Sequence, residues 1–186
     1  MKKLFALILV ICVITLTFAS CDIASIVNKV ITTEEPTDDP TLPKTYTYGV
    51  MNITLPAGFK EVKEGVFKND EVSVRCVRML FSSITPVGDN PFPTLEVFMK
   101  NCPSLREDPD KVFVKEENGI KYIDFETTSS NVASVFKAEK DGDMQCIMGF
   151  ETGNAFYIVS FYSPSLDYET VKTQAFEWAK TINFES

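Results

Sequence analysis

Histidine is missing from this sequence of 186 residues. Its absence removes the commonest general base and metal ligand, together with every nucleophile that depends on a Ser–His or Cys–His pair. Tryptophan occurs once, and no two cysteines have the C-x-x-C spacing that is typical of zinc and redox sites. No recognisable catalytic motif is present. We therefore expect a protein that is not an enzyme and that holds no cofactor or metal.

A basic and then apolar leader opens the chain. Lys2 and Lys3 precede an apolar run from Leu4 to Leu16, and residues 17–20 (Thr-Phe-Ala-Ser) lead to Cys21. A basic start, an apolar stretch and small residues before a cut are typical of a secretory signal. The ending Ala-Ser-Cys resembles bacterial lipoprotein signals, which are cleaved before a cysteine that is then acylated. We predict a signal peptide at residues 1–20 and lipidation of Cys21, which would place the protein on the extracytoplasmic face of the cell membrane.

Two other interpretations of the leader stay open, an uncleaved helical anchor and cleavage without a lipid. Residues 4–19 fall short of the about 20 apolar residues that span a bilayer core, and no strong charge cluster follows them. One acyl chain binds membranes only marginally, whereas the diacylglycerol implied by the lipoprotein resemblance would anchor the protein stably.

Residues 21–45 are predicted to be a lipidated, flexible tether. The stretch Thr32–Pro40 is acidic, contains proline and lacks bulky apolar residues, so it cannot bury enough surface to fold. Apolar residues at 23, 26, 27, 30 and 31 have helical spacing, but most are β-branched, and we prefer an unstructured segment to a short interfacial helix. Loss of the two leader lysines would change the formal net charge from −8 to −10. Such an acidic protein is a poor candidate for binding nucleic acid.

Short strands dominate the pattern from residue 46 onward. Residues 72–76 alternate cleanly, and the apolar phase then slips at Val77, which predicts a β-bulge there. Hairpin signals stand at Asn118-Gly119, Asp141-Gly142 and residues 152–154. Because neighbouring strands pair by default, these signals predict an antiparallel meander of five strands at 112–117, 120–126, 134–140, 144–151 and 156–162.

Two amphipathic helices complete the pattern. Thr94 is expected to cap the first, which carries Leu95, Phe98, Met99 and Cys102 on one face and ends at Pro103. Ser165 or Asp167 can cap the second, whose apolar stripe comprises Tyr168, Val171, Ala175, Trp178, Ala179 and Ile182. We predict one α+β domain at residues 46–186, in which helices flank an antiparallel sheet of six or more strands.

The order of these elements, with Ile-Thr-Leu-Pro-Ala-Gly-Phe at residues 53–59 before the strands, resembles the PsbP-like superfamily of α/β/α sandwiches, which includes the DcrB-type bacterial lipoproteins. The resemblance implies a largely non-enzymatic protein that assembles or supports membrane complexes. It provides no catalytic residue to transfer, and fold alone does not specify function.

The three cysteines that follow Cys21 are an odd number. Cys76 and Cys146 each alternate with apolar residues, so both are expected to be buried thiols in the core. One disulfide among Cys76, Cys102 and Cys146 would be permitted outside the cytoplasm, but we expect free thiols.

Three features of the sequence are candidate sites. The loop at residues 82–93 is long, and an exposed Phe92 with Asn90 and Val87 would suit contact with a protein partner, unless Phe92 is tucked under the loop. Asp141-Gly142-Asp143 could offer oxygens to a cation, but is expected to be a plain turn. The aromatic strand 156–162 is apolar on both faces and is expected to be a buried central strand rather than a ligand cleft.

The preferred function is a membrane-anchored module that binds an envelope protein, which an exposed apolar patch at a sheet edge or around residues 82–93 would support. A binder of a small ligand or an envelope fragment is the alternative, and it would need a closed apolar pocket with converging polar groups. A hydrolase would need a carboxylate or lysine dyad with shifted pKa values in a cleft. We expect that replacing any single carboxylate leaves fold and function largely intact.

Overall fold

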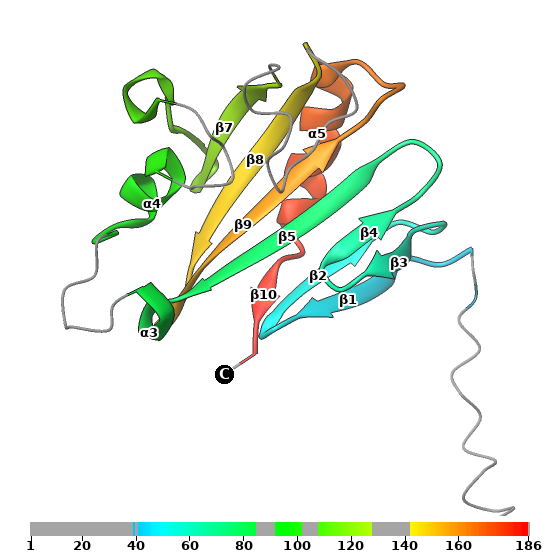
Figure 1. Ribbon diagram of the computed structural model, residues 1–186. Helices are drawn as coiled ribbons and strands as arrows, with labels where there is room; N and C mark the ends of the chain where they lie inside the picture. The colour runs from blue at the N-terminus through cyan, green and yellow to red at the C-terminus, as the bar shows by residue number, and fades with distance from the viewer. Residues whose placement is uncertain (1–38, 40, 85–91, 102–107, 128–141, 186) are drawn as a thin grey trace, which may run out of the picture. The chain divides into compact units, whose positions relative to one another are not determined.

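Two antiparallel sheets and a few helices make up the fold (Figure 1). The computed structural model describes residues 39, 41–84, 92–101, 108–127 and 142–185, and all but the first of these belong to one unit, Pro40–Ser186. The seven-stranded sheet has the order β3(Lys60–Lys63)-β4(Val66–Lys68)-β5(Ser73–Leu80)-β9(Ala155–Tyr162)-β8(Met144–Glu151)-β7(Ile120–Glu126)-β6(Lys115–Glu117). The three-stranded sheet has the order β1(Lys44–Tyr48)-β2(Met51–Leu55)-β10(Asn183–Phe184). The helices are α3(Phe81–Ile84), α4(Leu95–Asn101), the short 3₁₀ helix η1(Pro109–Lys111) and α5(Tyr168–Ala179). The predicted class, an α+β domain with helices flanking an antiparallel sheet, is confirmed.

Strand β9 lies at the centre of the large sheet and is buried along its whole length, as its two apolar faces predicted. Tyr157, Val159 and Phe161 point into a core that they share with α5 and the three-stranded sheet, which we call the α5-face core. Phe156 and Ile158 point into the second core, which includes Phe98 of α4 and which we call the α4-face core. The large sheet is therefore the middle layer between two separate cores.

The β-bulge predicted near Val77 is wrong. Strand β5 pairs with β9 without interruption, from Ser73 opposite Tyr162 to Leu80 opposite Ala155. Val74 and Cys76 belong to the α5-face core, whereas Val77 and Met79 face the α4-face core. The apolar phase shifts because the second face of the strand becomes covered as it runs toward α3 and α4, and no residue is inserted.

The predicted meander needs two corrections. Strand β7 pairs directly with β8, with Ile123 opposite Ile147, so no strand from residues 134–140 lies between them, and those residues fall outside the described ranges. The strand predicted at 112–117 begins only at Lys115. The turn at Asn118-Gly119 is confirmed, because both residues have positive φ, 53° and 78°, as a type I′ hairpin requires.

Each of the two predicted helices begins with a capping side chain. The Thr94 hydroxyl accepts from the Val97 N–H (3.2 Å) at the start of α4, and the Asp167 carboxylate accepts from the Thr170 N–H (3.0 Å) at the start of α5. Helix α4 lies so close to β8 that a Cβ on Gly149 would stand 2.4 Å from the Met99 sulfur. Glycine is needed there for close packing. Within the described ranges, no helix is both long and apolar enough to cross a bilayer.

The first and last described strands, β1 and β10, belong to the same small sheet. Strand β1 begins at Lys44, just inside the segment assigned to the tether, and the Tyr46 hydroxyl donates to the carbonyl of Phe59 (2.5 Å). Strand β10 pairs with β2, and the N–H of Glu185 donates to the carbonyl of Val50 (2.8 Å). The predicted leader and nearly all of the tether lie outside the described residues.

Cys76 and Cys146 are free thiols buried in the α5-face core, as the sequence predicted. Burial is the main cause that raises the pKa of each thiol to about 12. Neither is a reactive thiolate near neutral pH. Cys102 falls outside the described residues.

Candidate functional site

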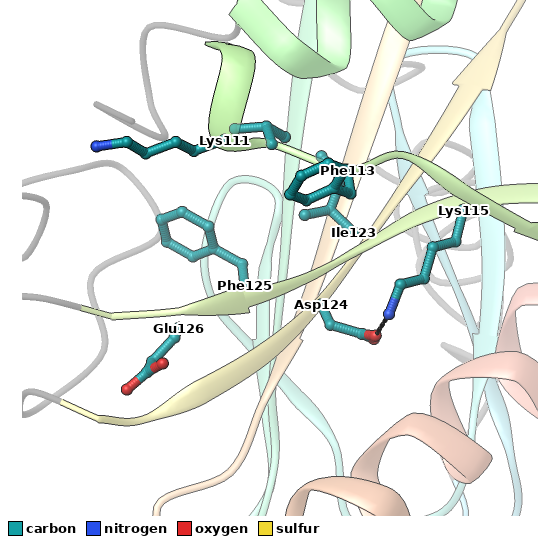
Figure 2. A pocket seen from close by; sticks show the side chains of 8 residues that line it. Lys111, Phe113, Lys115, Ile123, Asp124, Phe125 and Glu126 are labelled. Atoms are coloured by element: carbon teal, nitrogen blue, oxygen red, sulfur yellow. Dashed lines mark hydrogen bonds and ion pairs between the residues drawn. The ribbon is translucent and has the colours of Figure 1, made fainter. Parts of the chain in front are cut away.

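A solvent-open groove lies at the β6–β7 end of the large sheet. Its cavity volume is about 290 Å³ and it is lined by Lys111, Val112, Phe113, Lys115, Ile123, Asp124, Phe125 and Glu126. Figure 2 shows that the segment leading into β6 and the strand β7 run together at one end and separate toward the other, with Phe113 between them. We call this space the Phe113 groove. Phe113 is 72% exposed, the largest exposed fraction among the large hydrophobic side chains of the described residues.

The groove forms because β6 is shorter than β7 and begins to pair with it only at Lys115. The β6–β7 ladder ends with Lys115 opposite Tyr122, so within the described part of the chain no ladder covers the outer edge of β7 from Ile123 to Glu126. The preceding helix η1 is capped by Asp108, whose carboxylate accepts from the Asp110 N–H (3.1 Å). The segment 111–114 follows this turn and is not part of the β6–β7 ladder.

Alternation along this segment decides which side chains face outward. Val112 is buried and Val114 is half-buried, and both pack in the α4-face core. Lys111, Phe113 and Lys115 occupy the intervening positions and are exposed. The segment thus presents a lysine, an aromatic ring and a lysine at alternate positions of its solvent-facing side, which we call the Lys-Phe-Lys strip.

The strip differs from the protected edges of the same sheet. Edge strands normally carry charged residues, which prevent unwanted pairing with other strands. Strand β6 consists of Lys115, Glu116 and Glu117, and β3 at the opposite edge is Lys-Glu-Val-Lys, with every residue of both strands exposed. Val62 of β3 is 59% exposed but stands directly between Glu61 and Lys63. Phe113 has a valine on each side in the sequence and lies between Lys111 and Lys115 on the exposed side, so it is a large apolar group in solvent between two lysines.

A charged cluster closes the narrow end of the groove. Asp124 of β7 accepts from Lys115 (2.5 Å) and from the Tyr168 hydroxyl, and it pairs with Lys172 of α5 (3.4 Å). The Lys172 ammonium lies 4.6 Å from the centre of the Tyr122 ring, a distance at which the cation is attracted to the aromatic face. We call these five residues the Asp124 cluster. The side chains of Asp124 and Lys172 are only 17% and 18% exposed, so the cluster holds α5 and β6 to β7.

The pKa directions in the cluster suit a structural clamp. Burial alone would raise the pKa of Asp124, but hydrogen bonds from Lys115 and Tyr168 and the lysine charges outweigh it and lower that pKa. The hydrogen bond to Asp124 raises the pKa of Lys115. Burial, followed by the bond to Asp124, raises the pKa of Tyr168. Burial opposes the raised pKa of Lys172, and the contacts with Tyr122 and Asp124 overcome it. All four groups titrate further from neutral pH than usual, which is the opposite of what proton transfer at neutral pH requires.

A second polar group lies on the α4-side face of the sheet. The Ser160 hydroxyl donates to the Gln145 side-chain oxygen (2.7 Å), and the Gln145 amide donates to the Thr127 hydroxyl (3.3 Å). All three residues are buried, so they satisfy one another's hydrogen bonds in the interior. Searched over the described residues, no group of three His, Cys, Asp or Glu side chains is placed to hold a metal ion.

The residues predicted from the sequence as sites have different outcomes. Phe92 is half-buried and packs edge-on against Phe98 of α4, with 5.5 Å between the ring centres. Its predicted neighbours Asn90 and Val87, and the predicted lipidation site Cys21, lie outside the described residues. Asp143 accepts from the Tyr162 hydroxyl (2.8 Å), while Asp141 falls in a range that is not described.

Sequence reasoning missed both Phe113 and the Asp124 cluster. One signal for Phe113 was present, since Val112, Phe113 and Val114 are consecutive apolar residues. In an extended segment at a sheet edge, one of the two sides must then place an apolar residue in solvent. The Asp124 cluster had no such signal, because its members come from three separate elements, and its charged members each resemble an ordinary solvated residue in the sequence.

Comparison with known proteins gives one structural neighbour to report. No family model matches the sequence, and no curated protein matches it either. Among solved structures, the solution structure of cyanobacterial PsbP (CyanoP) from Synechocystis sp. PCC 6803 is similar to this chain, with a TM-score of 0.49 and 10% sequence identity. The match covers 78% of this chain and 94% of that one. No functional residue is carried over from it.

Proposed function

We propose that this protein is a membrane-tethered, non-enzymatic module that binds an envelope protein through the Phe113 groove. The observation that supports it is the 72% exposed Phe113 at a sheet edge. Aromatic side chains are enriched in the energetic centres of protein interfaces because they bury a large area with little loss of side-chain entropy. An exposed apolar group at a sheet edge favours unwanted association in solution, and a partner that covers it would remove that exposed surface.

The membrane attachment in this proposal depends on the leader. Lys2, Lys3, the apolar run and the Ala-Ser-Cys ending support acylation at Cys21. The acidic stretch before β1 would then act as a spacer between the lipid and the domain. Negative charge in a spacer of this kind favours an extended chain and keeps the domain away from an anionic surface.

Two surfaces are therefore candidates for the partner contact. The first is the Phe113 groove. The second is the loop around Phe92, with Asn90 and Val87, which the sequence indicated. We rank the groove first because Phe92 already packs on Phe98, whereas Phe113 is mostly solvated. A contact at Phe92 would use only the part of its ring that α4 leaves uncovered.

A small-ligand site is the weaker alternative. The groove, at about 290 Å³, lies at the lower limit of the roughly 300–1,000 Å³ that is usual for ligand pockets. It is open to solvent, and the carboxylate that lines its narrow end, Asp124, is already bonded by three side chains. Such a space suits one or two anchoring side chains of a protein better than an enclosed molecule.

The test is site-specific photo-crosslinking in cells with the full-length protein in its own membrane. A photoreactive residue is placed at position 113, at position 92 and at position 62, and crosslinked products are identified by mass spectrometry. Val62 is the matched control, since it is an exposed apolar residue on the opposite edge strand β3. We expect one dominant protein to be captured from position 113 and not from position 62.

The other outcomes separate the alternatives. Capture from position 92 alone would move the contact to the 82–93 loop. Absence of any captured protein, in a sample whose lipid attachment has been verified, would reject a protein-binding module. Native mass spectrometry of the same preparation would then be used to look for a small ligand.

A further inference from the structure

We infer that the partner presents an extended, acidic segment with an apolar anchor, which enters the Phe113 groove and pairs with the uncovered edge of β7. This inference rests on the proposed function and names the chemistry of the partner. It is carried by three features of the groove: an uncovered strand edge, an apolar wall and an uncompensated lysine.

The strand edge is the first feature. After Lys115 and Tyr122 the β6–β7 ladder stops, although β7 continues to Glu126 and stays paired with β8 on its other side. Antiparallel strands expose alternate backbone N–H and C=O groups at such an edge, and a peptide that adds as a strand satisfies them. The fork seen in Figure 2 between β7 and the segment 111–114 is the place where that strand would enter.

The apolar wall is the second feature. Phe113 forms this wall, since its ring is 72% exposed. Ile123 and Phe125 of β7 also line the cavity, but their side chains are buried in the α4-face core, 3% and 4% exposed. An apolar side chain of the partner would therefore lie against Phe113, since residues of neighbouring strands interact with directly opposite and diagonal positions. The cavity volume of about 290 Å³ corresponds to roughly ten water molecules, which is room for one or two side chains.

The charge pattern is the third feature. At the open end Lys111 is exposed and, considering the described residues, takes part in no ion pair. At the narrow end Lys115 and Lys172 share the single carboxylate of Asp124, which leaves a positive excess there. Glu126 also lines the groove, so three lysines (Lys111, Lys115 and Lys172) against two carboxylates (Asp124 and Glu126) leave an excess of one positive charge. In a chain with a formal charge of −8, this local excess of positive charge favours a partner segment with carboxylates on either side of its apolar residue.

The same charges argue against a second copy of this chain as the occupant. Two Lys-Phe-Lys strips side by side in an antiparallel arrangement would bring Lys111 of one copy opposite Lys115 of the other. Like charges directly opposite each other in neighbouring strands are destabilising, and two acidic chains repel each other at longer range.

The experiment measures peptide binding to the full-length protein in detergent micelles, by fluorescence anisotropy at two salt concentrations. The probe is the peptide Thr-Glu-Thr-Phe-Thr-Glu-Thr with a fluorescent label. The comparison peptides carry Lys in place of Glu, Ala in place of Phe, or methylated backbone nitrogens at alternate positions. We expect the acidic peptide to bind, with weaker binding at higher salt. The Lys peptide and at least one of the methylated peptides should bind much more weakly.

Matched variants locate the binding site. We expect Phe113→Ser to raise the peptide Kd roughly tenfold and Lys111→Glu to raise it about threefold, as for one exposed ion pair. Val62→Ser and Lys60→Glu on the opposite edge strand should leave the Kd unchanged. Both edges are exposed, so circular dichroism should show every variant folded.

Several results would overturn the inference: equal binding of the acidic and Lys peptides, equal binding of every methylated peptide, or equal effects of the Phe113 and Val62 variants. Sedimentation that showed dimers lost in Phe113→Ser would make a second copy the occupant. The inference and the proposed function can fail separately. If a protein is captured by crosslinking at position 113 and neither the acidic peptide nor Lys111→Glu reduces that capture, the proposed function stands and the inferred partner chemistry is wrong.

Discussion

Replacing Asp124 with Asn should loosen α5 from the large sheet. The substitution keeps the size of the side chain and one carbonyl oxygen, but it removes the negative charge that Lys115 and Lys172 share. Hydrogen bonds to a charged group contribute about 1.5–3 kcal/mol, against about 0.5–1.5 kcal/mol for neutral pairs. The hydrogen bonds from Tyr168 and Lys115 would each be weakened by part of this difference in free energy. The half-buried Lys172 would also lose its negatively charged partner.

We expect the free energy of unfolding to fall by about 2 kcal/mol, because Lys115 is half exposed and solvent already screens its contribution. With a urea m-value of about 2 kcal/mol per M, the unfolding midpoint would decrease by about 1 M. The assay is urea denaturation followed by the fluorescence of Trp178, the single tryptophan of the chain. It belongs to α5 and lies 5.4 Å from the Phe59 ring, so its emission reports the docking of that helix.

A control and a pH series make the reasoning refutable. Glu177→Gln removes an exposed ion pair with Lys180 on the same helix and should change stability by less than about 0.5 kcal/mol. The lowered pKa of Asp124 means that its contribution is present above the ordinary carboxyl pKa and is lost as the pH falls through the folded-state value. The deficit of Asp124→Asn should therefore shrink in acid. A deficit no larger than that of Glu177→Gln, or one that does not change with pH, would refute the clamp.

Three further predictions concern the core, the α4 contact and the leader. Above the ordinary thiol pKa of 9.0 the unfolded chain loses thiol protons that folded Cys76 and Cys146 keep up to about pH 12. In that interval each buried thiol should lower the free energy of unfolding by about 1.4 kcal/mol per pH unit. Cys146→Ala should therefore reduce the dependence of stability on pH in alkaline denaturation. Gly149→Val should destabilise the domain by about 1–3 kcal/mol, since the new side chain meets Met99, whereas Gly153→Ala, where a Cβ has open space, should change the urea midpoint far less. Metabolic labelling with a radioactive fatty acid should mark the wild-type protein and not Cys21→Ser, and equal labelling of both would reject lipidation at that residue.

The sequence predicted the parts of the fold in which local pattern and final environment agree. Strand β9 is apolar at both odd and even positions, which is the pattern expected of a strand that is buried on both faces of the sheet. The stripe on α5 and its Asp167 cap likewise depend on residues a few positions apart. Asn118-Gly119 needs a left-handed backbone at both positions, so its turn could be read directly.

The incorrect predictions concern segments whose burial or pairing depends on an element that is distant in the sequence. The phase shift at Val77 looks the same whether a residue is inserted or the second face becomes buried, and only the position of α4 distinguishes them. The direct pairing of β7 with β8 joins strands that residues 127–143 separate, which the hairpin signals alone did not predict. For Asp124 the structure gives a reason to expect a larger effect than the sequence predicted for any single carboxylate, since three side chains from β6 and α5 meet there.

The pairing of β10 with β2 has a consequence for the order in which the protein can be made. Strand β2 lies between the first strand and the last, and β5 pairs with β9, which follows it after about half the length of the domain. A chain that is synthesised from its N-terminus cannot complete either sheet until β9 and β10 have been made, because each sheet pairs an early strand with a late one. Stable folding would therefore be delayed until most of the domain has been synthesised.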